Sequence, residues 1–178
     1  MSSSFAVPDA SVVSRLVRIL LERGLTIAAA ESLTAGKFMA TLADVPGTSG
    51  TLRGGFVAYA TDLKAELVDV PEDVLATDGP VAESTAMYLA LGAQQRCSAD
   101  IGVGLTGVAG PTEQDGHPVG EVWLGFALPG QEPVAERHQF AGSRAQIRKQ
   151  AVAAAVSSLV ARLGNKSGSS DVGQSNGK

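Results

Sequence analysis

Two short runs of almost wholly apolar residues, 25–30 and 101–106, restrict the possible folds of this chain more than any other feature of its sequence. Neither run alternates apolar with polar residues, and such runs are typical of strands that are covered on both faces. Helical spacing of apolar residues is found before, between and after them, over residues 11–23, 34–43, 61–69, 80–96 and 143–163. Strands that alternate with helices in this way indicate a largely parallel sheet between helical layers.

Three further strands are predicted over residues 55–60, 120–128 and 134–140. The last two are joined by Pro129-Gly130, and so short a connection favours an antiparallel pair. The chain has 178 residues, of which 44% are hydrophobic, which is enough for one core and too little for two domains of ordinary size. We therefore predict an α/β protein, with a single three-layer α/β/α domain and a mixed, mostly parallel sheet.

The limits of this domain are predicted from the first and last helical patterns. Ser11 stands where a helix N-cap is expected, and Gly24 follows the last turn, where glycine is favoured. From Gly164 onward the chain is polar and glycine-rich with one apolar residue, Val172, which cannot offset the entropy of ordering. We expect a flexible N-terminus at 1–10, the domain at 11–163 and a disordered tail at 164–178.

Composition excludes several classes of function. The formal net charge is -4 and the isoelectric point is near 5.1, which argues against a nucleic-acid binder because phosphate contacts need a basic surface. Cys97 is the single cysteine, so neither an intramolecular disulfide nor a cysteine zinc site is possible, and a reducing cytoplasm fits. The sequence contains neither a signal-like N-terminus nor eighteen consecutive apolar residues, so we expect no membrane association.

Ligands of such sheets bind at the carboxyl ends of strands, and the first such loop is Glu-Ser-Leu-Thr-Ala-Gly at residues 31–36. It follows a buried strand and opens a helix, so Ser32 is expected near unpaired backbone N–H groups at the positive helix end. That position offers a nucleophile together with an oxyanion site. Spacing by itself favours the simpler interpretation, in which Ser32 or Thr34 only caps the helix, although spacing does not decide between the two.

The second loop carries Tyr59 at a strand end and Lys64 about one helical turn later. A lysine serves as a base for serine when burial leaves it neutral, and Tyr59 could relay the proton or orient Lys64. The alternatives are a solvated surface lysine and a tyrosine that merely packs. The two histidines, His117 and His138, have no acidic partner that their spacing identifies.

The third loop begins with Thr106 and Gly107 and continues to Gly110 and Pro111, and its glycines permit close approach of an anion. A plain turn explains the same residues. Arg144 and Arg148, four residues apart at the start of the last helix, would share one face and form a phosphate clamp. A protein carboxylate is the alternative partner for these cations.

Several motifs in register resemble the CinA C-terminal domain family over roughly residues 10–163. They are residues 31–36, Pro-Gly-Thr-Ser at 46–49, Arg-Gly-Gly-Phe-Val-Ala-Tyr at 53–59 with Lys64, Thr-Gly-Val-Ala-Gly-Pro at 106–111, Pro-Val-Gly at 118–120, and Gly-Ser-Arg at 142–144 with Arg148. The resemblance implies a mixed-sheet α/β/α domain that forms homo-oligomers. It also implies an amidohydrolase that converts the nucleotide nicotinamide mononucleotide and water into nicotinate mononucleotide and ammonia.

The resemblance also implies roles for single residues. Ser32 matches the catalytic serine, Tyr59 and Lys64 match a tyrosine and a lysine of the site, and Thr106 and Arg144 match positions of the substrate pocket. Neutral Lys64 would then take the proton of Ser32 directly or through Tyr59.

The expected oxyanion donors are backbone N–H groups of residues 34–36, which include Thr34 and Gly36, or of the loop from Gly107 to Gly110. We expect neither a metal nor a cofactor, since no cluster of His, Cys and carboxylate residues has ligand spacing. His117 departs from the family, because many relatives carry lysine just before Pro-Val-Gly. The pyrophosphatase activity of the N-terminal domain found in longer members is not expected here.

Two other functions stay open at this point. One is a binding module, either a nucleotide-phosphate sensor or a scaffold associated with competence, in which the site is not catalytic. The other is a serine–lysine hydrolase that acts on a different amide or ester.

Overall fold

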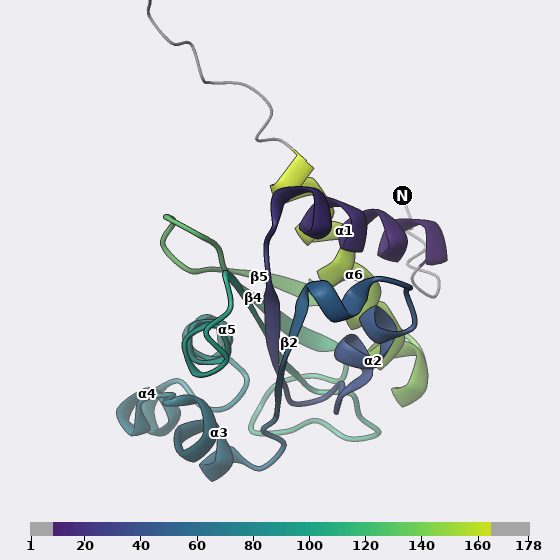
Figure 1. Ribbon diagram of the computed structural model, residues 1–178. Helices are drawn as coiled ribbons and strands as arrows, with labels where there is room; N and C mark the ends of the chain where they lie inside the picture. The colour runs from purple at the N-terminus through teal and green to yellow at the C-terminus, as the bar shows by residue number, and fades with distance from the viewer. Residues whose placement is uncertain (1–8, 165–178) are drawn as a thin grey trace, which may run out of the picture.

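The computed structural model describes residues 9–164 and has a five-stranded sheet at its centre (Figure 1). The strands are β1 (Ile27–Glu31), β2 (Leu52–Val57), β3 (Ile101–Gly107), β4 (Glu121–Ala127) and β5 (Val134–Gln139), in the order β2-β1-β3-β4-β5. β1 pairs in parallel with β2 and β3, whereas β4 pairs antiparallel with β3 and β5. The mixed sheet is therefore confirmed, and β4 runs against the other four described strands.

Helices cover both faces of this sheet (Figure 1). One layer holds α1 (Ala10–Arg23), α2 (Lys37–Ala43) and α6 (Arg144–Gly164), and the other holds α3 (Thr61–Val68), α4 (Glu72–Thr77) and α5 (Glu83–Arg96). A short 3-10 helix, Thr48–Gly50, precedes β2. This confirms the predicted three-layer α/β/α arrangement.

Residues of β1 alternate between the two layers, although all of them are apolar up to Ala30. Ile27 and Ala29 pack into the larger core with α1, α2 and α6, whereas Ala28 and Ala30 pack into the smaller core with α3 and α5. This two-sided burial explains the absence of polar alternation in the sequence. Glu31 continues the alternation toward the α2 side.

Small residues bring α5 unusually close to the sheet. A Cβ atom at Gly104 of β3 would lie 2.3 Å from the carbonyl oxygen of Ala86, and one at Gly125 of β4 would lie 1.9 Å from the same oxygen. The backbone of α5 therefore packs directly on the strands, which a side chain at either glycine would prevent. As a result the segment before α5 is held beside the carboxyl end of β3, where the Thr106 hydroxyl donates to the Pro80 carbonyl at 2.6 Å.

The ends of several elements differ from the prediction. The N-cap of α1 is Asp9, whose side chain accepts a hydrogen bond from the Ser11 backbone, so the prediction of Ser11 as the cap is wrong. α2 begins at Lys37 because residues 33–36 form a turn, and α4 was not predicted. The ends predicted to be flexible (1–10) or disordered (164–178) lie outside the described residues, with three exceptions. Asp9 caps α1, Ala10 is the first residue of α1, and Gly164 is the last residue of α6.

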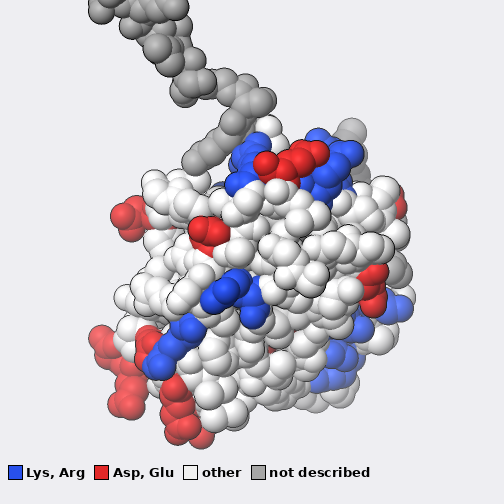
Figure 2. Space-filling view, viewed as in Figure 1, with Lys and Arg blue, Asp and Glu red and all other residues white. Residues whose placement is uncertain are grey.

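Figure 2 shows how charge is distributed on one face of the molecule. Acidic side chains gather over α3 and α4, where Asp62, Glu66, Glu72 and Asp73 are exposed, while lysine and arginine side chains are scattered rather than arranged in a stripe. The absence of nucleic-acid binding stays a prediction. Within residues 9–164, no helix combines the length and the hydropathy that crossing a membrane requires.

Candidate active site

Ser32 directly follows β1 and opens the turn that leads into α2. Its backbone N–H donates to the Leu105 carbonyl at 2.8 Å, which extends the pairing of β1 with β3 by one residue. Ala35 and Gly36 then adopt positive φ angles of 48° and 86°, a region that residues other than glycine rarely occupy. The chain thus reverses sharply after Ser32, whose side chain lies at the edge of a cavity.

Glu31, the residue before Ser32, binds the beginning of α2. Its buried carboxylate accepts hydrogen bonds from the backbone N–H groups of Phe38 at 3.1 Å and Met39 at 2.9 Å. A carboxylate is a favourable partner for a helix N-terminus. The expectation of unpaired N–H groups at this helix end is therefore wrong for these two residues. The role of Glu31 was missed, although an acidic residue that ends an apolar strand just before a helix is a usable signal.

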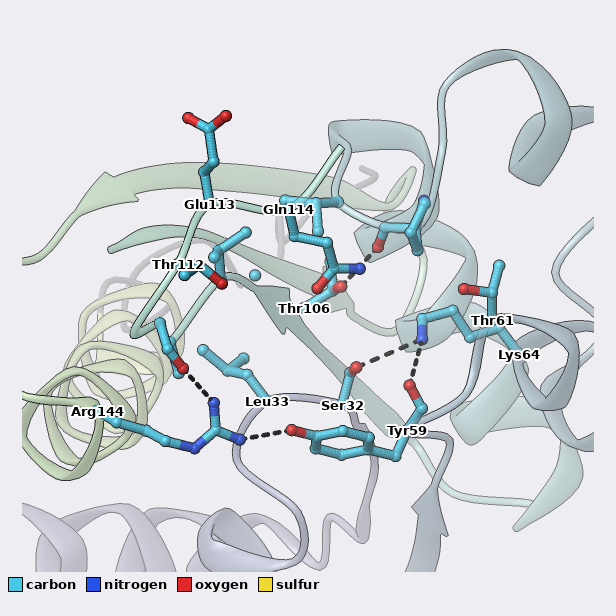
Figure 3. Close-up of a pocket in the computed structure, with 16 residues that line it drawn as sticks. Ser32, Leu33, Tyr59, Thr61, Lys64, Thr106, Thr112, Glu113, Gln114 and Arg144 are labelled. Atoms are coloured by element: carbon cyan, nitrogen blue, oxygen red, sulfur yellow. Dashed lines mark hydrogen bonds between the residues drawn. The ribbon is translucent and has the colours of Figure 1, made fainter. Parts of the chain in front are cut away.

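Lys64 lies in α3, yet its side chain is only 1% exposed. Its Nζ donates to Ser32 Oγ at 3.3 Å and to the Tyr59 carbonyl at 3.4 Å (Figure 3). The carbonyls of Ala58 at 3.0 Å and Ala60 at 3.4 Å accept from the same atom. Burial lowers the pKa of Lys64 to about 8, against a smaller opposing effect of Asp62. The interpretation of Lys64 as a solvated surface lysine is therefore wrong, and a chemically useful share of the amine is neutral near pH 7.

Tyr59 contributes to the site in a different way from the one expected. Its phenol oxygen receives a hydrogen bond from Arg144 Nη2 at 2.5 Å, while Arg144 Nη1 donates to the Gly110 carbonyl at 2.6 Å (Figure 3). The contact of Tyr59 with Lys64 is made by the backbone carbonyl. The structure thus pairs the phenol with Arg144 and does not place it between Lys64 and Ser32.

These residues surround a cavity of about 240 Å³ at the carboxyl ends of β1 and β3. Figure 3 shows the Ser32 and Lys64 side chains pointing toward one another on one side, with Thr112 and Glu113 on the loop across from them. The predicted site residues that line the cavity are Ser32, Tyr59, Lys64, Thr106, Gly107, Gly110 and Arg144. Residues from four separate segments of the chain therefore meet at one cavity.

Three predicted site residues, Thr34, Gly36 and Arg148, are not among those that line the cavity. Thr34 is buried, and its hydroxyl has no hydrogen-bond partner within the described part of the chain. Arg148 donates to the carbonyls of Leu33 and Thr34 instead of reaching the cavity. The paired Arg144–Arg148 clamp is therefore not formed, since one guanidinium lies at the cavity and the other behind the Ser32 turn.

Sequence reasoning also missed residues that line the cavity. Pro80 and Val81 precede α5 and reach it only because α5 packs so closely on the sheet, and no sequence signal indicated them. Thr112, Glu113 and Gln114 directly follow Pro111, where the predicted ligand loop ended. Their position next to that loop is the signal that could have identified them.

Comparison with known proteins identifies the family of this chain. Residues 9–163 match the family described as the CinA C-terminal domain. The chain belongs to this family.

Curated relatives and solved structures show the extent of the similarity. Competence-damage inducible proteins of Lactiplantibacillus plantarum and Levilactobacillus brevis are 42% and 44% identical over 85% and 81% of this chain. The chain spans only 36% and 35% of the length of these two relatives. The crystal structure of the competence/damage inducible protein CihA from Agrobacterium tumefaciens has a TM-score of 0.84 at 30% identity, covering 92% of this chain and 99% of that one. ComA from Klebsiella pneumoniae has a TM-score of 0.85 at 28% identity, covering 88% and 98%.

Histidines take no part in this CinA-type cavity. His117 Nδ1 lies 3.2 Å from Glu121 Oε1, and His138 Nε2 lies 3.3 Å from Glu136 Oε2. Both histidines thus have acidic partners that spacing did not identify, and neither lines the cavity. Residues 9–164 contain no group of three or more His, Cys, Asp or Glu residues arranged to hold a metal ion. Among the described residues, Lys64 is consequently the base candidate in contact with Ser32.

Proposed function

We propose that this chain hydrolyses the carboxamide of nicotinamide mononucleotide, releasing ammonia and nicotinate mononucleotide, with Ser32 as the nucleophile and Lys64 as the base. The observation that carries the proposal is the buried Nζ of Lys64, 3.3 Å from Ser32 Oγ, with its pKa lowered to about 8. A helix cap requires no such neighbour. Membership of the CinA C-terminal domain family supports the choice of substrate.

The reaction begins with the transfer of the Ser32 hydroxyl proton to neutral Lys64, while Oγ attacks the carboxamide carbon. The resulting ammonium group of Lys64 then returns the proton to the departing nitrogen, so ammonia leaves and an ester to Ser32 remains. Water, deprotonated by Lys64, attacks this ester and restores the serine. The overall reaction is balanced, because one amide and one water give one carboxylic acid and one ammonia.

The negative oxygen of the tetrahedral intermediate requires hydrogen-bond donors near Ser32. The backbone N–H of Leu33, the residue after the nucleophile, has no acceptor within residues 9–164, and Leu33 lines the cavity. The N–H groups of Ala109 and Gly110 in the loop after β3 are similarly available. Each donor of this type is commonly worth about 3 kcal/mol in the transition state.

Arg144 is the group proposed to bind the phosphate of the substrate. It lies at the cavity, and a guanidinium has five N–H donors, of which Tyr59 and Gly110 occupy two. Tyr59 is then a residue that positions Arg144 rather than a proton relay. Because a site built for phosphate discriminates strongly against a ligand that lacks it, nicotinamide riboside should be a poor substrate, whereas a general amidase would accept it.

The test is ammonia release from nicotinamide mononucleotide by the wild type, Ser32→Ala and Ser14→Ala. Ser14 is exposed on α1 and serves as the matched control. We expect release by the wild type and the control, and loss of at least about a thousandfold in Ser32→Ala. An acyl group on Ser32, trapped by rapid acid quench and detected by mass spectrometry, would support the covalent route. Near-normal turnover by Ser32→Ala would refute the proposal.

A further inference from the structure

The side chain of Arg148 is directed at the backbone of the Ser32 turn. Its Nε donates to the Leu33 carbonyl and its Nη2 donates to the Thr34 carbonyl, each at 2.8 Å, and the side chain is half-buried. Arg148 is the fifth residue of α6. Both hydrogen bonds are made to backbone carbonyls of one turn, so the side chain connects α6 to the segment that carries Ser32.

The two contacts fix two consecutive peptide groups of the turn. A planar guanidinium binds two acceptors in one defined orientation, which a lysine ammonium does not do. Because peptide groups are planar, holding a carbonyl also fixes the direction of the N–H group on the other side of the same peptide. Arg148 therefore sets the orientation of the peptides on both sides of Thr34, immediately before the strained φ angle of Ala35.

Two charged side chains thus hold the chain after Ser32 from different elements. Glu31 binds the first amides of α2, and Arg148 binds the carbonyls of the turn before α2. The hydroxyl of Thr34, by contrast, makes no hydrogen bond within the described residues. The turn is consequently held through its backbone by groups that do not reach the cavity.

We propose that Arg148 is a positioning residue that keeps Ser32 Oγ beside Lys64 Nζ, and that it does not bind the phosphate of the substrate. This inference rests on the proposed function of Ser32 as the nucleophile. Arg148 then acts on the chemical step, whereas Arg144 acts on substrate binding. The two arginines, one helical turn apart in α6, form a matched pair for testing this division.

The kinetic test compares Arg148→Met, Arg148→Lys and Arg144→Met on nicotinamide mononucleotide. Misplacing a reacting group by about 1 Å costs on the order of a hundredfold in rate, so we expect Arg148→Met to lower kcat by tenfold to a hundredfold with KM changed less than about threefold. Arg148→Lys should recover part of kcat, because it retains a donor but loses the fork. Arg144→Met should raise KM by tenfold or more. A raised KM with unchanged kcat in Arg148→Met would overturn the inference.

A second measurement does not depend on activity. The backbone N–H of Ala35 donates to the Ser32 carbonyl and that of Lys37 donates to the Thr34 carbonyl, each at 3.1 Å, so their hydrogen exchange reports opening of the turn. We expect exchange at both amides to accelerate at least tenfold in Arg148→Met and to stay unchanged in Arg144→Met. If Arg148→Met fails to fold, Arg148→Lys takes its place in both measurements. Unchanged exchange would overturn the inference, whereas a wild type that releases no ammonia would overturn only the proposed function.

Discussion

Replacing Lys64 by methionine should change how the stability of this protein depends on pH. Lys64 is buried and contacts Ser32 Oγ and the Ala58 carbonyl, and burial lowers its pKa to about 8. In the unfolded chain the same amine has a pKa near 10.4. Between these two values the unfolded state binds more protons than the folded state, so the stability of the wild type rises with pH in this window. A methionine side chain does not titrate and cannot contribute such a rise.

The magnitude follows from the two pKa values. A lowering to about 8 corresponds to about 3 kcal/mol of cost for burying the charged amine. Below pH 8 this cost is present in full, and above about pH 10.4 it is absent. Methionine removes the cost but also leaves the Ala58 carbonyl without its donor, which costs about 1 kcal/mol. We therefore expect Lys64→Met to be more stable than the wild type at pH 7 by about 2 kcal/mol and to lose this advantage by pH 10.

Urea unfolding at pH 7, 8, 9 and 10 measures this difference. The free energy of unfolding of the wild type relative to Lys64→Met should rise by about 2.5 kcal/mol between pH 7 and pH 10, which is a change of about 1 M in the relative urea midpoint. The matched control is Lys149→Met, because Lys149 is exposed on α6 and its replacement should alter stability equally at every pH. If the free energies of unfolding of the wild type and Lys64→Met changed in parallel from pH 7 to pH 10, the lowered pKa of Lys64 would be refuted. The proposal that neutral Lys64 is the base would be refuted with it.

Three further predictions concern the base, the turn and the packing of α5. For the wild type, kcat/KM for nicotinamide mononucleotide should rise about tenfold per pH unit below pH 8 and level off above it, since only neutral Lys64 accepts the proton; a flat profile from pH 6 to pH 9 would contradict this. Glu31→Ala leaves the Phe38 and Met39 amides unpaired and should lower the free energy of unfolding by about 2 kcal/mol in urea titrations. Gly104→Ala places a Cβ atom 2.3 Å from the Ala86 carbonyl oxygen and should cost about 3 kcal/mol, measured in the same way.

The arrangement of layers could be predicted because it depends on local patterns. The apolar runs at 25–30 and 101–106 correspond to β1 (Ile27–Glu31) and β3 (Ile101–Gly107). The short Pro129-Gly130 connection correctly indicated that β4 and β5 are antiparallel. The spacing of apolar residues in the sequence depends on whether an element is a helix or a strand and on whether one face or both are buried. Each element type can therefore be recognised without knowledge of the neighbouring elements.

The start of α2 was predicted less well, because a side chain that is distant in the sequence contributes to it. α2 begins at Lys37 rather than Thr34 because Ala35 and Gly36 have positive φ angles, in a turn whose carbonyls Arg148 of α6 binds. Arg148 is 115 residues from Leu33 in the chain. No local pattern around the turn contains that contact.

The sequence by itself predicted that Ser32 and Lys64 would follow buried strands, at whose carboxyl ends ligands of such sheets bind. The place of Arg144 at the same site was predicted only from its match to the CinA C-terminal domain family. Only the tertiary structure decided what each cation does there. Lys64 is buried against Ser32, Arg144 lies at the cavity, and Arg148 binds the backbone of the turn after Ser32. All three occupy early turns of helices and resemble ordinary surface cations in the sequence, since the burial of a side chain depends on which elements pack over it.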